Sequence, residues 1–417
     1  MMTVSSTSCS RRNGFALALA ACLTIAALFP VAARAQSADP VVLSFSTVGD
    51  SRQDPVAPDA TTLPLSAQDK IWLQNTKAWS RIMRSIQSQK SNFLFFNGDM
   101  IMGYGKADVP ADTSTISAIV NSDLVQTYRQ YAFWRGMVAP LMETGTYVVP
   151  VPGNHEVQWK AGGKIALEVN ENAWRENMGD LILDPTRFNN LLGAPVDHFD
   201  VNNYPQIGGT PGNAADINGS SGIDLITTDQ RQLSYSFDFK GSHFAVINTD
   251  PTGNDTHAPV NWLAADLAAA RARGATHFFV FGHKPAYTYF YNDASGTPPK
   301  DAPITKKSGF DADTKNRDLF WNLIEAYGAT YFCGHEHIFN AQQPTKATGG
   351  SAWQVIVGSG GSPFEAAVVD SHNAVTDRMY AWANVRVFQS GKVQIDAYGF
   401  NDAYGPTQLI KTIVLTH

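Results

Sequence analysis

Short apolar runs rich in β-branched and aromatic residues recur along the chain, and most of them end at glycine, asparagine or aspartate. Runs of this length and composition predict β-strands. The predicted strands are residues 41–48, 93–96, 147–151, 233–239, 243–247, 277–281, 330–333 and 353–357. Near the C-terminus, 385–388 and 393–396 flank Ser390-Gly391 and predict a hairpin, and 409–415 predicts a final strand.

Between several of these strands, apolar residues recur at helical spacing instead. Such faces are formed by Trp72, Thr76, Trp79, Ile82 and Ile86; by Leu124, Tyr128, Tyr131 and Val138; by Leu263 and Leu267; and by Leu319, Leu323 and Tyr327. Because strands and helices alternate along the chain, the pattern predicts an α/β fold.

Five of the predicted strands are followed at once by a glycine-containing turn that carries a side chain able to bind metal. These turns hold Gly49-Asp50, Gly98-Asp99, Gly153-Asn154-His155, Gly282-His283 and Gly334-His335-Glu336-His337. In a single turn of this kind, glycine and a short polar residue more often serve the turn conformation than bind a metal. Five in succession place carboxylate, amide and imidazole donors at the carboxyl ends of strands, where α/β proteins bind ligands. This mixture of oxygen and nitrogen donors suits divalent metal ions, and two ions sharing a carboxylate suit phosphoryl transfer.

The order of these motifs resembles that of the calcineurin-like metallophosphoesterases, which include the purple acid phosphatases. The resemblance extends from Asp50 to His337, and the glycine-rich segment 357–361 fits it as well. It implies a four-layer α/β/β/α sandwich of two facing mixed sheets with helices outside, and a metal centre at the strand carboxyl ends.

The resemblance also implies a centre of two divalent or mixed-valence ions, of iron, manganese or zinc. Asp99 would bridge the ions, and His155 would act on the leaving group as general acid or donate to the phosphate oxygens. The other implied ligands are Asp50 and His337 for the first ion, and Asn154, His283 and His335 for the second. We expect His335 and His337 to project to one side of an extended segment. The simpler alternatives are that the aspartates cap helices and that the histidines are a structural pair.

The sequence departs from the family pattern at two positions. Arg52 stands where much of the family has a histidine ligand, and Met102 stands where purple acid phosphatases have a tyrosine, with Tyr104 two residues further on. The first ion would then have three protein ligands. Arg52 cannot ligate a metal, but its planar fork can bind a phosphate, so we hypothesise that it clamps the substrate. The alternative is a poorly occupied first site.

These features predict an exported phosphoesterase that hydrolyses small phosphomonoesters or phosphodiesters by attack of a metal-bound hydroxide. The alternative is a secreted binding protein that keeps the scaffold but has an impaired first metal site. The amino acid sequence does not distinguish monoesters from diesters.

The N-terminal segment predicts export. Arg11 and Arg12, an apolar run over 15–29 and Ala33-Arg34-Ala35 are typical of a signal peptide over residues 1–35, which leaves 36–417 as the catalytic domain. Cleavage removes three arginines and no acidic residue, so the formal net charge changes from −6 to −9. This acidic chain lacks the footprint of a nucleic-acid binder. We expect a secreted or periplasmic protein with no membrane attachment after cleavage.

Several further residues receive simpler interpretations. Cleavage removes Cys9 and Cys22, and the remaining Cys333 is expected to be a small buried side chain. The irregular segments 202–229 and 287–314 are predicted either to rim the site or to be plain surface loops. Tyr287, Tyr289, Phe290 and Tyr291 would stack on an aromatic leaving group or pack the loop. Turn or supporting positions are expected for Glu156, Lys284 and Glu336, and surface positions for His198, His243, His257 and His277.

Overall fold

The computed structural model describes residues 39–54, 67–200, 224, 226, 228–289, 308–364 and 379–415, with only the backbone described over 67–74. The predicted signal peptide, most of the two irregular segments, and Phe290 and Tyr291 lie outside these residues. The described residues all belong to one compact unit that begins at Asp39. None of their helices has both the length and the apolarity needed to cross a bilayer.

The first sheet has six strands. Their bounds are β1 Val41–Val48, β2 Phe93–Asn97, β3 Tyr147–Val151, β13 Met379–Phe388, β14 Val393–Asn401 and β15 Gln408–Leu415. They lie in the order β15-β14-β13-β1-β2-β3. β1, β2 and β3 are parallel, so their carboxyl ends meet at one edge, whereas the C-terminal strands extend the sheet by antiparallel pairing.

The second sheet has seven strands. Their bounds are β6 His198–Asp200, β7 Tyr235–Phe239, β8 Ser242–Val246, β9 His277–Phe281, β10 Thr330–Cys333, β11 Phe339–Gln342 and β12 Trp353–Val357. The order is β11-β12-β10-β9-β8-β7-β6. Its central strands β8, β9, β10 and β12 are parallel, and its outer strands are antiparallel. A separate small sheet pairs β4 (Gln158–Trp159) with β5 (Ile165–Ala166).

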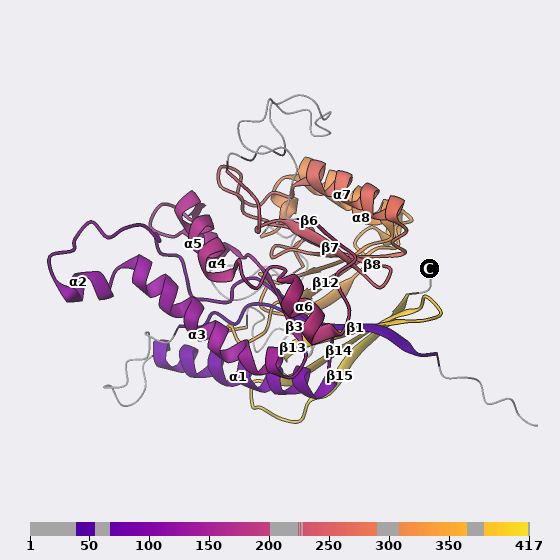
Figure 1. Cartoon of the computed structure of the whole chain (residues 1–417), viewed down its shortest axis with the longest axis horizontal. Coiled ribbons are helices and arrows are strands. Elements are labelled where there is room, and N and C mark those ends of the chain that lie inside the picture. Colours follow the sequence, from indigo (N-terminus) through magenta and orange to yellow (C-terminus); the bar gives the residue numbers. More distant parts are fainter. Residues whose placement is uncertain are drawn as a thin grey trace, which may run out of the picture. The chain divides into compact units, whose positions relative to one another are not determined.

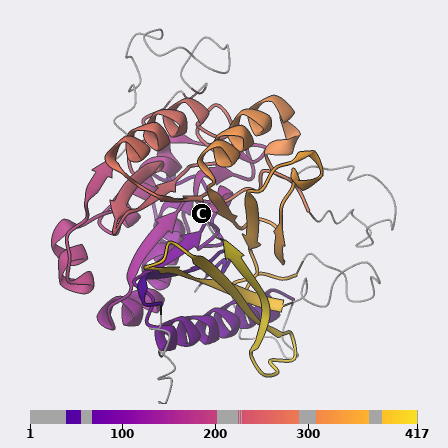
Figure 2. The same ribbon diagram turned by 90° about the vertical axis from the view of Figure 1, so that its right-hand side faces the viewer.

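Phenylalanine side chains join the two large sheets face to face. Phe45 of β1 makes edge-on ring contacts with phenylalanines of β8, β9 and β10. Phe95 of β2 stacks on Phe281 of β9 with ring centroids 3.8 Å apart. All these rings are buried, and aromatic pairs of this kind stabilise a core beyond the area that they remove from water. Figures 1 and 2 show the two sets of strands lying against each other.

Helices α1 (Ala67–Gln89) and α3 (Asp123–Glu143) cover the outer side of the first sheet, and α7 (Val260–Arg273) and α8 (Thr314–Tyr327) cover that of the second. The other helices are α2 Ile116–Val120, α4 Asn154–Val157, α5 Glu168–Met178 and α6 Pro185–Leu192. Trp79 of α1 and Trp134 of α3 both pack edge-on against Phe96 of β2. Leu263 of α7 and Trp321 of α8 belong to a second buried cluster with strands of the other sheet. Figure 2 shows α1 in indigo and the orange helices on opposite sides of the strands.

The predicted α/β fold with two facing sheets is therefore confirmed, and most predicted strands begin and end within two residues of the observed ones. The sequence analysis did not identify α2, α4, α5, α6, β4, β5, β6 or β11. For α6 a signal was present, because Asp184 caps the helix through the backbone N–H groups of Thr186 and Arg187, and Pro185 takes the first helical position.

The prediction of surface positions was wrong for three histidines. His243, His257 and His277 are buried, whereas His198 is half-buried. His243 is fully enclosed because its two ring nitrogens contact Asp238 at 2.7 Å and Asp266 at 3.0 Å. Burial alone lowers the pKa of His243, but these two carboxylates outweigh it and raise the pKa to about 9. The ring is therefore charged and paired inside the fold.

This pairing predicts a pH-dependent stability. A pKa raised in the folded state stabilises the protein fully below the ordinary value of 6.5, and this stabilisation is lost as pH rises through about 9. His243→Gln should lower the free energy of unfolding by about 3 kcal/mol in mildly acidic buffer, because it removes the buried positive charge that pairs with both Asp238 and Asp266. The difference should shrink in alkaline buffer. Urea unfolding measures both, with His198→Gln as the control, and a pH-independent difference would contradict the prediction.

Candidate metal centre

The metal-binding motifs gather where the carboxyl ends of the parallel strands of both sheets meet. Backbone hydrogen bonds join the sheets there. Gly49 N–H, after β1, donates to Val357 O of β12 at 2.8 Å, and Gly360 N–H donates back to Gly49 O at 2.9 Å. His283, after β9, reaches across to the carbonyl of Asn97 at the end of β2. The two sheets therefore hold their motif turns against each other.

One set of donor atoms converges on Asn154 Oδ1. This oxygen lies 2.8 Å from His283 Nε2 and 2.9 Å from His335 Nδ1, and the two nitrogens are 3.1 Å apart. Asp99 Oδ1 completes the set at 3.2 Å from His283 Nε2. These four residues follow four different strands and are those expected to bind the second ion.

A second set is formed by Asp50, Asp99 and His337, whose ligand atoms lie within 4.8 Å of one another. Asp50 Oδ1 is 3.6 Å from His337 Nε2. All three residues are buried. The structure thus brings together every residue proposed as a ligand of the first ion, and Asp99 belongs to both sets.

The donor chemistry fits a pair of first-row divalent ions. Each set mixes carboxylate oxygen with imidazole nitrogen, and one carboxylate is common to both, as a bridging ligand must be. Because His283 Nδ1–H donates to Asn97 O, the lone pair of His283 Nε2 faces the oxygens of Asn154 and Asp99, and a cation among these atoms would relieve their repulsion. The two sets could therefore hold the two ions of a dinuclear centre.

Hydrogen bonds to backbone carbonyls determine which ring nitrogen of His283 and of His337 faces the centre. His283 Nδ1–H donates to Asn97 O at 2.8 Å, and His337 Nδ1–H donates to Pro363 O at 2.8 Å, so Nε2 of each ring faces the centre. Such outer hydrogen bonds are typical of metal-binding histidines. Burial lowers the pKa values of His283, His335 and His337 below the usual range, so these rings are neutral and keep the lone pair that a metal requires.

Asp99 is fully buried and remains ionised. Burial raises the pKa of its carboxyl, but His155, His283 and Arg52 outweigh this effect and hold the pKa well below the usual range. Arg52 approaches from the solvent side, with Nε and Nη2 each 3.4 Å from Asp99 Oδ2. Because the Arg52 side chain is 23% exposed, it lies at the rim of the centre.

The backbone is strained at the motif turns. Asp50, Asp99 and His335 have φ values of 64°, 53° and 69°, which side chains larger than glycine rarely adopt. His335 and His337 lie on a tight bend, so the prediction of an extended segment was wrong. The bend results from Glu336 N–H bonding back to Gly334 O at 2.8 Å. A Cβ on Gly334 would lie 2.2 Å from Asp50 Oδ2, so only glycine permits this approach.

Glu156 organises the bridging turn. Its two carboxylate oxygens accept hydrogen bonds from the backbone N–H groups of Asp99, Met100, Ile101 and Gly153, at 2.8–3.2 Å. Glu156 thus ties the turn after β2 to the turn after β3. The supporting position expected for it is observed, but the sequence did not reveal which turn it supports.

The other expected supporting residues lie behind the centre. Lys284 is buried and pairs with Asp250, a residue that the sequence analysis did not single out. Glu336 accepts a hydrogen bond from Ser308 Oγ at 3.0 Å.

Tyr287 packs edge-on against Trp321, which favours loop packing over contact with a leaving group. Cys333 is buried as predicted.

Tyr104 is a part of the centre that the sequence analysis set aside. Its hydroxyl accepts a hydrogen bond from Asn154 Nδ2, and its ring lies against that of His155 with centroids 3.8 Å apart. Met102 contributes its carbonyl, which accepts from His155 Nδ1. The one available signal was the nearness of Tyr104 to Asp99 in the sequence.

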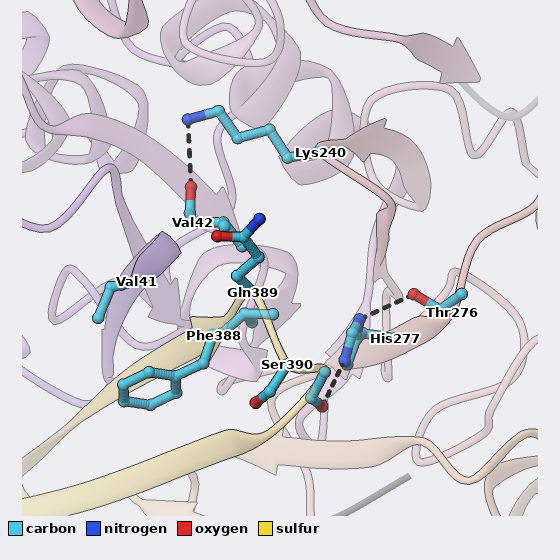
Figure 3. A pocket seen from close by; sticks show the side chains of 10 residues that line it. Val41, Val42, Lys240, Thr276, His277, Phe388, Gln389 and Ser390 are labelled. Carbon is cyan, nitrogen blue, oxygen red and sulfur yellow. Dashed lines mark hydrogen bonds between the residues drawn. The ribbon is translucent and has the colours of Figure 1, made fainter. Parts of the chain in front are cut away.

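A cavity of about 880 Å³ lies away from this centre, at the opposite ends of the strands. It is lined by Val41 at the start of β1, His277 at the start of β9, Lys240 and Phe388 (Figure 3). Its polar groups bond within the fold: Lys240 Nζ donates to Val42 O, and His277 Nε2 donates to Gly391 O. The chemistry-bearing residues therefore do not line this cavity.

Comparisons with known proteins give similar solved structures and a matching family model. Among solved structures, the chain resembles a purple acid phosphatase from yellow lupin (Lupinus luteus) seeds, with a TM-score of 0.50 and 11% identity over 89% of this chain and 53% of that one. The chain thus spans about half the length of that protein. A dimetal phosphatase from Danio rerio matches with a TM-score of 0.44 and 10% identity over 90% of this chain and 99% of that one.

At these identities the structural likeness shows the fold alone. A comparison with curated protein sequences gave no match. A family model described as calcineurin-like phosphoesterase matches residues 72–339, a range that holds the motif residues from Asp99 to His337 and leaves Asp50 outside. Because this range is more than half of the sequence, the chain belongs to the calcineurin-like phosphoesterase family.

Proposed function

We propose that this protein is a metal-dependent phosphoesterase that hydrolyses small phosphomonoesters or phosphodiesters. One observation carries the proposal: the buried carboxylate of Asp99 is shared by two sets of metal-binding atoms. Membership of the phosphoesterase family supports the reaction class. The assembled first set, Asp50, Asp99 and His337, favours a catalyst over a binding protein with an impaired first site.

Each residue has a role that its position supports. The ions, when bound, would acidify a water molecule and neutralise the charge on the phosphoryl oxygens. Asp50, Asp99 and His337 would hold the first ion, and Asn154, His283 and His335 would hold the second with Asp99. The strained, glycine-lined turns fix these side chains before substrate arrives, so little reorganisation is needed during the reaction.

Arg52 is placed to bind the phosphate. Its guanidinium carries a permanent charge, and its partly exposed side chain lies beside the bridging carboxylate. The contacts of 3.4 Å to Asp99 Oδ2 are longer than a strong charge-assisted hydrogen bond. The guanidinium of Arg52 would form shorter hydrogen bonds with two oxygens of a bound phosphate.

His155 is placed to handle the proton of the leaving group. Its Nδ1–H donates to Met102 O, and its Nε2 lies 3.5 Å from Asp99 Oδ2 and faces the centre. Burial, followed by Arg52, lowers the pKa of His155 to about 3, so the ring is neutral near neutral pH. A bound phosphate dianion favours the imidazolium form, and Nε2 would then hold the proton that the departing alcohol needs.

The first prediction concerns hydrolysis itself. With added Mn²⁺, Zn²⁺ or Fe²⁺, the protein should hydrolyse a chromogenic phosphomonoester or diester, and chelation should abolish the reaction. Asp99→Asn removes the bridging charge and His335→Ala removes a ligand, so each should lower kcat by at least about 100-fold. Asp318→Asn, which alters an exposed carboxylate on α8, is the control. Full activity of Asp99→Asn would refute the assignment.

The second prediction concerns Arg52. Arg52→Ala should mainly raise KM for phosphoesters, by about tenfold or more, because it removes a charged hydrogen-bonding partner of the phosphate. Arg52→Lys keeps the charge but not the fork, so its KM should lie between those of the wild type and the alanine variant. Steady-state kinetics measures both, and metal content should stay unchanged. An unaltered KM in Arg52→Ala would exclude the clamp.

A further inference from the structure

The backbone around Tyr104 is held tightly against the segment that carries Asn154 and His155. Tyr104 N–H donates to His155 O at 3.0 Å, and Tyr104 O accepts from Lys160 N–H at 3.1 Å. A Cβ on Gly103 would lie 1.8 Å from His155 O, so only glycine fits before the tyrosine. Tyr104 itself has a φ of 66°, an uncommon conformation for a tyrosine. The loop therefore presents the Tyr104 side chain in one place.

The Tyr104 hydroxyl contacts one end of the Asn154 amide. Asn154 Nδ2 donates to this hydroxyl, while Asn154 Oδ1 lies within 2.9 Å of His283 Nε2 and His335 Nδ1. An amide has one donor end and one acceptor end, and only the oxygen can bind a metal ion. When a cation lies at the second set of donors, the amide oxygen faces the cation, and the Tyr104 hydroxyl accepts from the N–H group at the other end and holds the amide in that position.

The Tyr104 ring has a separate contact. It lies against the His155 ring with centroids 3.8 Å apart and an interplanar angle of 38°. Replacing tyrosine by phenylalanine keeps this contact and removes the hydroxyl alone. The two parts of the side chain can therefore be tested separately.

We propose that Tyr104 is a positioning residue, whose hydroxyl sets the amide of Asn154 so that its oxygen binds the second metal ion. This inference rests on the dinuclear centre of the proposed function. It does not require that the protein hydrolyse any particular ester. If the protein binds two ions but hydrolyses no phosphoester, the proposed function is contradicted and the proposed role of Tyr104 is not.

The test is a calorimetric titration of the metal-free protein with Mn²⁺. Tyr104→Phe should weaken binding of one of the two ions by about 10- to 100-fold, the usual effect of losing a partner that orients a metal ligand. Tyr147→Phe is the matched control. It removes a hydroxyl from another buried tyrosine, one that accepts from Asp184 N–H at 2.9 Å away from the centre, and should leave both affinities unchanged.

A double-mutant cycle separates positioning from a general structural effect. Asn154→Ala removes the side chain through which Tyr104 is proposed to act. Adding Tyr104→Phe to Asn154→Ala should therefore weaken Mn²⁺ binding no further, and the coupling between the two sites should account for the whole effect of the single variant.

Three results would overturn the proposal. Unchanged Mn²⁺ affinities in Tyr104→Phe would show that the hydroxyl has no role. An equal loss from Tyr104→Phe in the wild type and in the Asn154→Ala variant would show that the effect does not act through the amide. An intense visible band in the iron-loaded protein that Tyr104→Phe abolishes would show that Tyr104 binds metal directly.

Discussion

The centre depends on one costly arrangement, an ionised carboxylate that is buried between two sheets. Asp99 has no exposed surface, and burial alone raises the pKa of its carboxyl. Arg52 and the backbone N–H of His155 offset part of that cost at its side-chain oxygens, while Glu156 accepts from the backbone N–H groups of the same turn. Two cations would complete the compensation. The burial of this one group therefore explains why so many polar side chains converge on the same strand ends.

The packing of the two sheets makes this convergence possible. Phenylalanine contacts such as that of Phe95 with Phe281 bring the faces of the sheets together and align the carboxyl ends of parallel strands. The turns that follow these strands lie so close together that a Cβ on Gly334 would collide with the Asp50 side chain. In the same turns, Asp99 and His335 adopt left-handed backbone conformations. The apolar core thus supplies the free energy that holds strained turns in place.

Much of this site was predictable because each motif residue directly follows a strand, and parallel strand ends must gather at one edge. Asp50, Asp99, Asn154, His283, His335 and His337 were identified in this way. Other features depend on contacts between turns that are far apart in the sequence, and the spacing of residues along the chain does not predict such contacts. The hydrogen bonds of Glu156 to the turn after β2 and the contact of Tyr104 with Asn154 are of this kind. The burial of His243 was missed because Asp266 approaches it from a helix.

The central claim is that Asp99 is shared by two metal ions, and electron paramagnetic resonance of the manganese-loaded protein tests it most directly. Two Mn²⁺ ions bridged by one carboxylate are close enough for their spins to couple. The account predicts two ions per chain with the spectrum of an exchange-coupled pair in the wild type, and loss of that coupling in Asp99→Asn. A wild-type protein that binds a single ion, or two ions with the spectrum of isolated Mn²⁺, would contradict it.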